Sequence, residues 1–353
     1  MKKLLLLMAL ALLLTACQNT LEIEEPILPE EPLVVEITPE PEPEEEEEDP
    51  GPDLTGLALN ALTGHFIDEE AAASRPIAIV IDNISAALPQ SGIAQADIIY
   101  ETLAEGATTR LVAIFTTVDS ERIGPVRSTR HNFTDFALAH DAIFVHHGGS
   151  PQGYAAISNL RVDNLDGMHV SAAFFRDRTR ATGGMRPLEH SSFVRSAELF
   201  DAIDARGFRR DLNEEFSQIF EFFDDECEVA GEEMHEVVVT FAPGKVGRFN
   251  YIEGANVYLR TQNDNPHIDE YSGQQLAVEN VIVKYARMRV MDGEGRRDVT
   301  LVGEGRGTLH TRGVSIPVLW SRESNHSPTI WTFEDGEPMR ITRGKTWICI
   351  MPE

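Results

Sequence analysis

A chain of 353 residues, 42% of them hydrophobic, is long enough for two domains with a substantial buried core. Its formal net charge of −28 repels the phosphates of nucleic acids and of anionic membrane surfaces, so we expect no nucleic-acid partner. Much of this charge is local, because residues 18–56 carry 15 acidic side chains and no Lys or Arg.

The first residues have the pattern of a leader rather than of the fold. Leu4 to Leu14 is an apolar run preceded by two lysines, and it is too short to span a bilayer. Leu14-Thr15-Ala16-Cys17 then matches a bacterial lipobox; an ordinary secretory signal with a chance cysteine is the alternative. We therefore expect residues 1–16 to be a signal peptide and Cys17 to be lipidated. Its lipid would hold the protein at the extracytoplasmic face of the cell membrane.

Residues 17–56 begin with this cysteine and have the composition of a tether. Eight of the chain's 19 prolines lie here, together with the acidic run from Glu44 to Asp49. Proline and repulsion between like charges favour an extended chain without a packed core. At about 3 Å per residue the tether reaches on the order of 100 Å, enough to lift the folded part through a cell wall.

The segment 57–233 alternates short apolar runs with helical patterns. The predicted strands are 77–81, 96–103, 111–118 and 142–147, and the predicted helices are 129–140, 151–160 and 197–206. The residues Glu105 to Thr109 join the second and third strands, which suits a hairpin. This order of elements predicts a mixed sheet with helices packed on it.

After residue 234 the pattern is typical of β-structure. Strands are predicted at 236–242, 256–261, 278–290, 299–302, 308–310, 314–321, 329–333, 339–341 and 346–351. The glycine-rich segment from Gly303 to Gly307 is predicted to be a hairpin turn. The fold class is therefore α+β, with an N-terminal mixed α/β sandwich domain (57–233) followed by a β-rich C-terminal domain (234–353).

The stretch from Gly124 to Gly153 concentrates groups that can bind an anion. Arg127 and Arg130 offer two planar guanidinium groups suited to carboxylate or phosphate. Ser128 lies at the predicted start of the helix 129–140, where backbone N–H groups are free.

A second loop in this stretch repeats the arrangement of strand, glycines and helix start. If both loops lie at the same end of the sheet, they form one positive, hydroxyl-bearing pocket. A nearby basic cluster that contains Arg176 and Arg180 either extends this site or is a solvated loop. The candidate ligand-binding residues are Arg127, Ser128, Arg130, His131, His147, Gly148, Gly149, Ser150, Arg176 and Arg180.

Each of these residues also has a structural interpretation. The two arginines of the first loop could pair with Glu101, Glu105 or Asp135 in salt bridges, and the paired glycines could form a tight turn. Ser150 could act as a nucleophile with His147 or His131 as its base. It is better explained as a helix N-cap, because a Gly-x-Ser-x-Gly context is missing.

The sequence does not point to a metal or a cofactor. His146 and His147 are neighbours in a predicted strand, so their side chains point to opposite faces. No cysteine–histidine spacing typical of zinc sites is present. Cys227 and Cys349 could form a disulfide outside the cytoplasm or remain two free thiols, and the sequence leaves both open.

Several motifs, in order, resemble those of the YerB-like bacterial lipoproteins. They are PIAIVIDN, PQSGIAQADIIYETLAEGATTRLVAIF, IGPVRSTR, HDAIFVHHGGSPQ, VDNLDG, NVYLRT, VENVIV and GKTWICIMP. The resemblance covers about residues 75–353 and implies a lipid-anchored, two-domain, extracytoplasmic protein. It supplies no reaction and no catalytic residues. The family pattern has an Arg-rich loop that runs into a Pro-His-Asn segment, whereas this chain has ATGGMRPLEHSS there, with His190 as the counterpart of that histidine.

Three functions are compatible with these residues. The first is a surface-tethered lipoprotein that binds an anionic small molecule, a cell-wall fragment or another envelope component. The second is an envelope hydrolase or transferase that uses the same pocket. The third is a structural lipoprotein that docks an envelope protein through its β-rich domain. Whether the protein is an enzyme stays open at this point.

Overall fold

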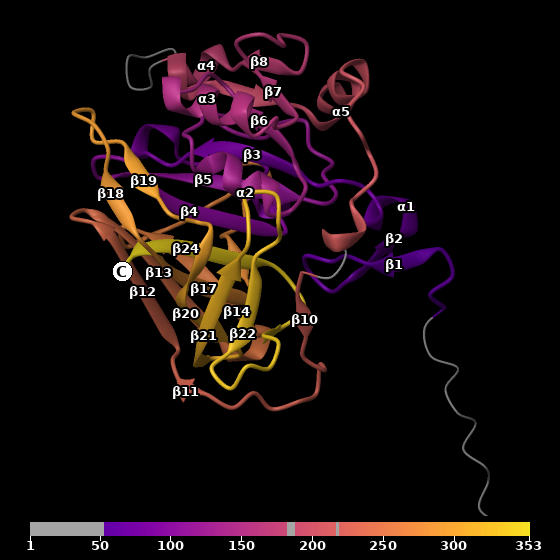
Figure 1. The fold of residues 1–353 in the computed structure, drawn as a ribbon, viewed down its shortest axis with the longest axis vertical. Helices are drawn as coiled ribbons and strands as arrows, with labels where there is room; N and C mark the ends of the chain where they lie inside the picture. Colours follow the sequence, from indigo (N-terminus) through magenta and orange to yellow (C-terminus); the bar gives the residue numbers. More distant parts are fainter. Residues whose placement is uncertain (1–52, 182–187, 217–218) are drawn as a thin grey trace, which may run out of the picture. The chain divides into compact units, whose positions relative to one another are not determined.

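The computed structural model describes residues 53–181, 188–216 and 219–353 (Figure 1). The predicted signal peptide, Cys17 and most of the tether lie outside these ranges. Among the helices that are described, none has the length and apolar character needed to cross a membrane.

A mixed sheet of eleven strands organises the folded part. In spatial order its strands are β11 (Glu232–Glu233), β21 (Val314–Arg322), β20 (Gly303–Thr311), β17 (Asn280–Ala286), β24 (Thr346–Pro352), β4 (Ile98–Glu105), β5 (Thr108–Phe115), β3 (Ile77–Asp82), β6 (Ile143–His146) and β7 (Asn164–Asp166), with β22 (Ile330–Phe333) paired to β21. The hairpin predicted between β4 and β5 is present, and β3 pairs antiparallel with β5 and parallel with β6.

The last strand of the chain joins the N-terminal and C-terminal parts of this sheet. β24 runs parallel to β17 on one side and parallel to β4 on the other. In Figure 1 the yellow β24 accordingly lies next to the purple β4. Its residues Thr346 to Ile350 are buried, as expected for a central strand covered on both faces. The sheet is therefore continuous across the two segments that the sequence separates.

A second sheet packs against the C-terminal half of the first. Its strands are β12 (Glu236–Ala242), β13 (Lys245–Ile252), β14 (Val257–Gln262), β15 (Asn265–Pro266) and β16 (Ala277–Val278). The remaining pairs are β1 (Leu57–Leu59) with β2 (Phe66–Asp68), β8 (Phe174–Arg176) with β9 (Ser192–Val194), β10 (Glu221–Phe222) with β23 (Arg340–Ile341), and β18 (Met288–Val290) with β19 (Arg297–Val299). In β12 buried and exposed residues alternate, so one face covers the core and the other meets solvent.

Short helices lie between the strands. The α-helices are α1 (Glu69–Ala72), α2 (Phe133–Leu138), α3 (Pro151–Asn159), α4 (Arg178–Ala181) and α5 (Ser196–Ala205). Single 3-10 turns occupy Ser85–Ala87, Ile93–Gln95, Leu188–His190, Glu214–Phe216 and Glu253–Ala255.

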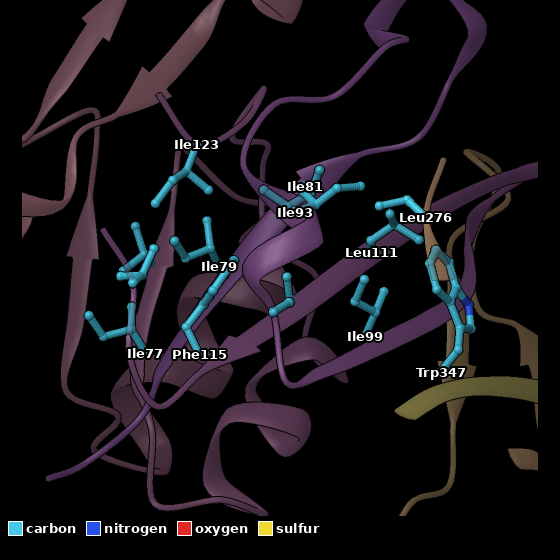
Figure 2. Close-up of a cluster of buried hydrophobic side chains, with 14 of the residues drawn as sticks. Ile77, Ile79, Ile81, Ile93, Ile99, Leu111, Phe115, Ile123, Leu276 and Trp347 are labelled. Atoms are coloured by element: carbon cyan, nitrogen blue, oxygen red, sulfur yellow. The ribbon is translucent and has the colours of Figure 1, made fainter. Parts of the chain in front are cut away.

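The central strands β3, β4 and β5 of the main sheet are buried on both faces. The side chains of β3 alternate, so that Ile77, Ile79 and Ile81 enter one hydrophobic cluster while Ala78 and Val80 enter the other. Figure 2 shows the first cluster, with Ile77 and Trp347 toward its opposite ends. Helix α5 contributes to this cluster, and α2 contributes to the one on the other face.

The structure corrects two sequence predictions and adds one strand that was not predicted. The helix predicted at 129–140 begins only at Phe133, because Thr129 is paired with Gly149 in a β-bridge. The segment Gly303 to Gly307 is the first half of β20 and not a turn, since it is paired along its length with β21. Strand β13 was missed because its pattern includes glycine and charged residues.

Candidate functional site

The two loops predicted to bind an anion lie side by side. The backbone N–H of Thr129 donates to the carbonyl of Gly148 over 3.0 Å, and the N–H of Ser150 donates to Thr129 over 3.2 Å. The N–H of His147 in turn donates to the carbonyl of Arg127 over 3.0 Å. The first loop reaches this place because Val126 forms a β-bridge with Ile81 of β3, and β3 in turn pairs parallel with β6, from which the second loop continues.

Ser150 is the N-cap of α3, as predicted. Its Oγ accepts a hydrogen bond of 3.0 Å from the N–H of Gly153, and Pro151 occupies the first turn. In the described part of the chain no histidine is hydrogen-bonded to Ser150 Oγ. The cap therefore accounts for this hydroxyl, and a nucleophilic role for Ser150 has no support.

A pocket of about 330 Å³ opens between the two loops. Six of the ten predicted residues line it, namely Arg127, Ser128, His147, Gly148, Gly149 and Arg176. Val126, Tyr154, Met168 and Glu189 complete the lining. The pocket thus brings together guanidinium groups from two segments that are 49 positions apart in the sequence.

His147 is held between Arg176 and Ser192 in one tautomer. Its Nε2 lies 2.9 Å from Nη2 of Arg176, and its Nδ1 lies 2.7 Å from Oγ of Ser192. Arginine can only donate, so Nε2 accepts and the neutral ring carries its proton on Nδ1. Burial, and then the charge of Arg176, lower the pKa of His147 to about 4. The ring therefore donates to Ser192 and is oriented the wrong way to remove a proton from that hydroxyl.

Arg127 connects the pocket to a buried carboxylate. Its Nε lies 3.4 Å from Oδ2 of Asp82, which also accepts a 2.6 Å hydrogen bond from Nδ1 of His190. Burial alone would raise the pKa of Asp82, but the His190 bond and the charge of Arg127 outweigh it, so the pKa is lowered. On the solvent side Nη2 of Arg127 lies 3.6 Å from the carboxylate of Glu189, which is 55% exposed.

Four of the predicted residues do not line this pocket. Arg130 makes a 2.8 Å hydrogen bond to Glu105, and His131 bonds Asp298 on β19 over 3.1 Å. Arg180 is buried and donates to the carbonyls of Ala87 and Pro89. Ser150 is used as the helix cap. The salt-bridge interpretation of Arg130 is the one that the structure supports.

Comparison with known proteins places this fold in a family. Residues 62–209 match the family described as "Protein of unknown function (DUF3048) N-terminal domain", and residues 237–348 match its C-terminal domain. The chain belongs to the DUF3048 family. It is 31% identical over 305 residues to "Putative lipoprotein YerB" of Bacillus subtilis, an alignment that spans 86% of this chain and 88% of that protein.

A solved structure agrees with this assignment. The crystal structure of the YerB protein from Bacillus subtilis matches with a TM-score of 0.72 and 29% sequence identity. The match covers 84% of this chain and 97% of that one. The resemblance to YerB-like proteins inferred from the sequence motifs is thus confirmed, and so is the division into N-terminal and C-terminal DUF3048 domains.

The sequence reasoning missed the residues that shape the pocket of this DUF3048 member. Asp166 accepts hydrogen bonds from the N–H groups of Gly148 and Met168 and from the hydroxyl of Tyr154, all within 2.9 Å. One of the backbone N–H groups expected to be free is therefore occupied by a carboxylate. The motif VDNLDG, which contains Asp166, was the available signal, because the side chain of an acidic residue at the end of a short strand often accepts hydrogen bonds from nearby backbone N–H groups.

Glycines allow the close packing around His147. Gly148 has a φ of +74°, which favours glycine. A Cβ at Gly167 would lie 2.3 Å from Nδ1 of His147. Gly148 therefore needs glycine for its backbone conformation, and Gly167 needs glycine to leave room for the imidazole between Arg176 and Ser192.

His146 and His147 serve different partners, as their strand positions predicted. Nδ1 of His146 lies 2.8 Å from the carbonyl of Gly148, and its Nε2 lies 3.2 Å from Asn164. Within residues 53–181, 188–216 and 219–353 no group of three His, Cys, Asp or Glu side chains could hold a metal ion. Cys227 and Cys349 are both free thiols.

Proposed function

We propose that this protein is a lipid-anchored extracytoplasmic lipoprotein that binds the anionic group of a ligand in the pocket of Arg127 and Arg176. The lipobox at Cys17 and the name of the Bacillus subtilis relative support the anchor. The leader and the acidic tether favour a position outside the cytoplasmic membrane. The ligand would carry a carboxylate or a phosphate, as a small molecule or a cell-wall fragment does.

The main support for this proposal is that the guanidinium groups of Arg127 and Arg176 line the same pocket. Burial and the charge of Arg127 both lower the pKa of Arg176, so the two cations lie close enough to repel each other. Arg176 donates to the neutral His147 and to the carbonyl of Leu188, and neither partner neutralises its charge. A bound anion would relieve this repulsion and receive charge-assisted hydrogen bonds.

The alternative of a hydrolase gains nothing from the geometry. The only serine hydrogen-bonded to the imidazole of His147 in the described ranges is Ser192, and its Oγ accepts the hydrogen bond from the ring instead of donating one. Arg176 lies at the ring nitrogen of His147 that does not face the serine, and in a catalytic triad this nitrogen is bonded to an aspartate. Anion binding is therefore the function that the pocket supports best.

Replacing Arg176 with glutamine should abolish the stabilisation of the protein by anions. Inorganic phosphate and acetate are the probes, and the melting temperature is measured by thermal unfolding at constant ionic strength. Loss of one charge-assisted hydrogen bond costs about 1.5–3 kcal/mol, so binding should weaken by about ten- to hundredfold. Arg127→Gln should have a similar effect on anion binding.

The matched control is Arg248→Gln. This arginine is half-buried on β13 and pairs with Asp264 over 2.9 Å. Its replacement changes the net charge by the same amount as Arg176→Gln, but it does not line the pocket. It should leave the anion-induced stabilisation intact. If all three variants respond to phosphate and acetate as the unmodified protein does, the pocket does not bind anions.

Replacing Glu189 with glutamine should strengthen anion binding. Its exposed carboxylate competes with the ligand for Arg127, and an exposed pair of this kind is worth about 0.2–1 kcal/mol. Phosphate should therefore bind about threefold tighter, as measured by titration calorimetry. Glu236→Gln is the control, because that carboxylate is 54% exposed and lies 3.5 Å from Arg248. Equal affinities in Glu189→Gln and Glu236→Gln would contradict this arrangement.

A further inference from the structure

A second and larger pocket lies between the N-terminal and C-terminal parts of the sequence. Its volume is about 500 Å³. Leu88 and Pro89, from the loop after β3, form one side. Pro266 and Ile268, from the segment at β15, add apolar surface on the other. None of these residues belongs to the pocket of Arg127 and Arg176.

Two deeply buried polar side chains also line this pocket. Gln262 is 5% exposed and His267 is 2% exposed. Among the described residues, Oε1 of Gln262 and Nδ1 of His267 have no hydrogen-bond partner. A buried polar atom without a partner costs about 1–3 kcal/mol, so two such atoms at one pocket point to a ligand that satisfies them.

The surrounding hydrogen bonds determine that both free atoms are acceptors. Nε2 of Gln90 donates to the carbonyl of Asp82 and to Oδ1 of Asn83. Its Oε1 must therefore accept from Nε2 of His267, 2.7 Å away. Burial, and then the charges of Arg260 and Lys245, lower the pKa of His267, so the ring is neutral and Nδ1 has a lone pair. Gln262 directs its amide nitrogen to the carbonyl of Asn83, which leaves Oε1 as an acceptor.

The charge around the pocket selects the class of ligand. The charges of Arg260 and Lys245 act on His267 and disfavour a cation beside it. An anion would receive no hydrogen bond from Oε1 of Gln262 or Nδ1 of His267, because both atoms are acceptors. A neutral ligand with hydroxyl donors satisfies both atoms, and the apolar walls of Leu88, Pro89 and Pro266 can cover the carbon face of such a molecule.

We propose that this pocket binds a neutral, hydroxyl-rich ligand of the size of a sugar ring, with two hydroxyl groups donating to Gln262 and His267. The site is separate from the anion pocket, so the protein would hold two chemically different groups. This inference does not depend on the proposed anion binding.

Saturation-transfer NMR with the full folded chain tests the proposal. The probes are glucose and myo-inositol, which are neutral, and glucuronate, which resembles glucose but carries a carboxylate. Signals are expected for the two neutral probes at millimolar concentration. Gln262→Leu should weaken their binding by about tenfold, the value of one hydrogen bond of typical strength. Absence of signals from both neutral probes would overturn the proposal.

Two further variants separate the sites and guard against misfolding. Ser85→Trp places a large ring at the exposed rim of the pocket, where no buried bond is disturbed, and it should also reduce the glucose signal. Arg176→Gln should leave the glucose signal unchanged even if it abolishes the response to phosphate. Glucose binding that persists in both Gln262→Leu and Ser85→Trp, or glucuronate binding as well as glucose at this pocket, would overturn the assignment.

Discussion

Arg260→Met is expected to lower the free energy of unfolding by about 3–5 kcal/mol, because it leaves the carboxylate of Glu101 buried and unpaired. Arg260 on β14 is 1% exposed, and its Nη2 lies 2.8 Å from Oε2 of Glu101, which is fully buried on β4. The guanidinium also contacts the rings of Phe249 and Trp347, whose centroids lie 4.8 and 4.9 Å from its central carbon. This pair links the N-terminal and C-terminal segments beneath β24.

Urea-induced unfolding, followed by circular dichroism, measures this loss. The matched control is Arg248→Met on the neighbouring strand β13, which removes a half-buried arginine and should change stability by only about 0.5 kcal/mol. The double variant Arg260→Met/Glu101→Gln should recover most of the loss, because it no longer buries a charge. If Arg260→Met costs no more than Arg248→Met, the buried pair is not the link that the geometry indicates.

Lys284→Met is expected to stabilise the protein by about 3 kcal/mol at neutral pH, since it removes a charge that is costly to bury. Lys284 on β17 is 4% exposed, and its Nζ lies 3.7 Å from the ring centroid of Trp320 and 5.6 Å from that of Trp331. Burial, and then the charge of Arg322, lower its pKa to about 7, against the opposing effect of Asp135. The contacts with the indole rings offset part of this cost.

The effect should depend on pH in a defined direction. Above the usual lysine pKa of 10.5 both the folded and the unfolded chain hold a neutral amine, so the penalty vanishes. As the pH falls from 10.5 toward 7, the unfolded chain takes up a proton before the folded chain does, and the unmodified protein loses stability relative to the methionine variant. Below about 7 both states are protonated and the difference stays constant.

Chemical denaturation of both proteins across this alkaline range tests the direction. Lys284→Arg is the informative contrast, because its guanidinium stays charged and cannot escape the penalty by losing a proton. Its deficit relative to the unmodified protein should therefore grow as the pH rises, while the advantage of Lys284→Met shrinks. Differences that do not change with pH in either variant would mean that the ammonium of Lys284 is not penalised by burial.

Local patterns in the sequence were sufficient for part of this structure. The hairpin of β4 and β5 could be predicted because two runs of β-branched residues flank a short connection. Ser150 followed by Pro151 predicted the start of α3, since cap and first turn depend only on neighbouring residues. The ordered motifs predicted the family.

Only the tertiary structure decided which residues share a pocket. Arg127 and Arg130 are three positions apart, yet one enters the pocket and the other pairs with Glu105, because pairing between distant strands sets the direction of each side chain. Arg176 and Glu189 reach the pocket from a segment whose sequence shows no regular pattern. The insertion of β24 between β17 and β4 was equally hidden, because sequence patterns report the burial of a strand but not the identity of its neighbours. The stretch from Gly124 to Gly153 therefore predicted loops that can hold an anion, while long-range pairing determined the side chains that complete the pocket.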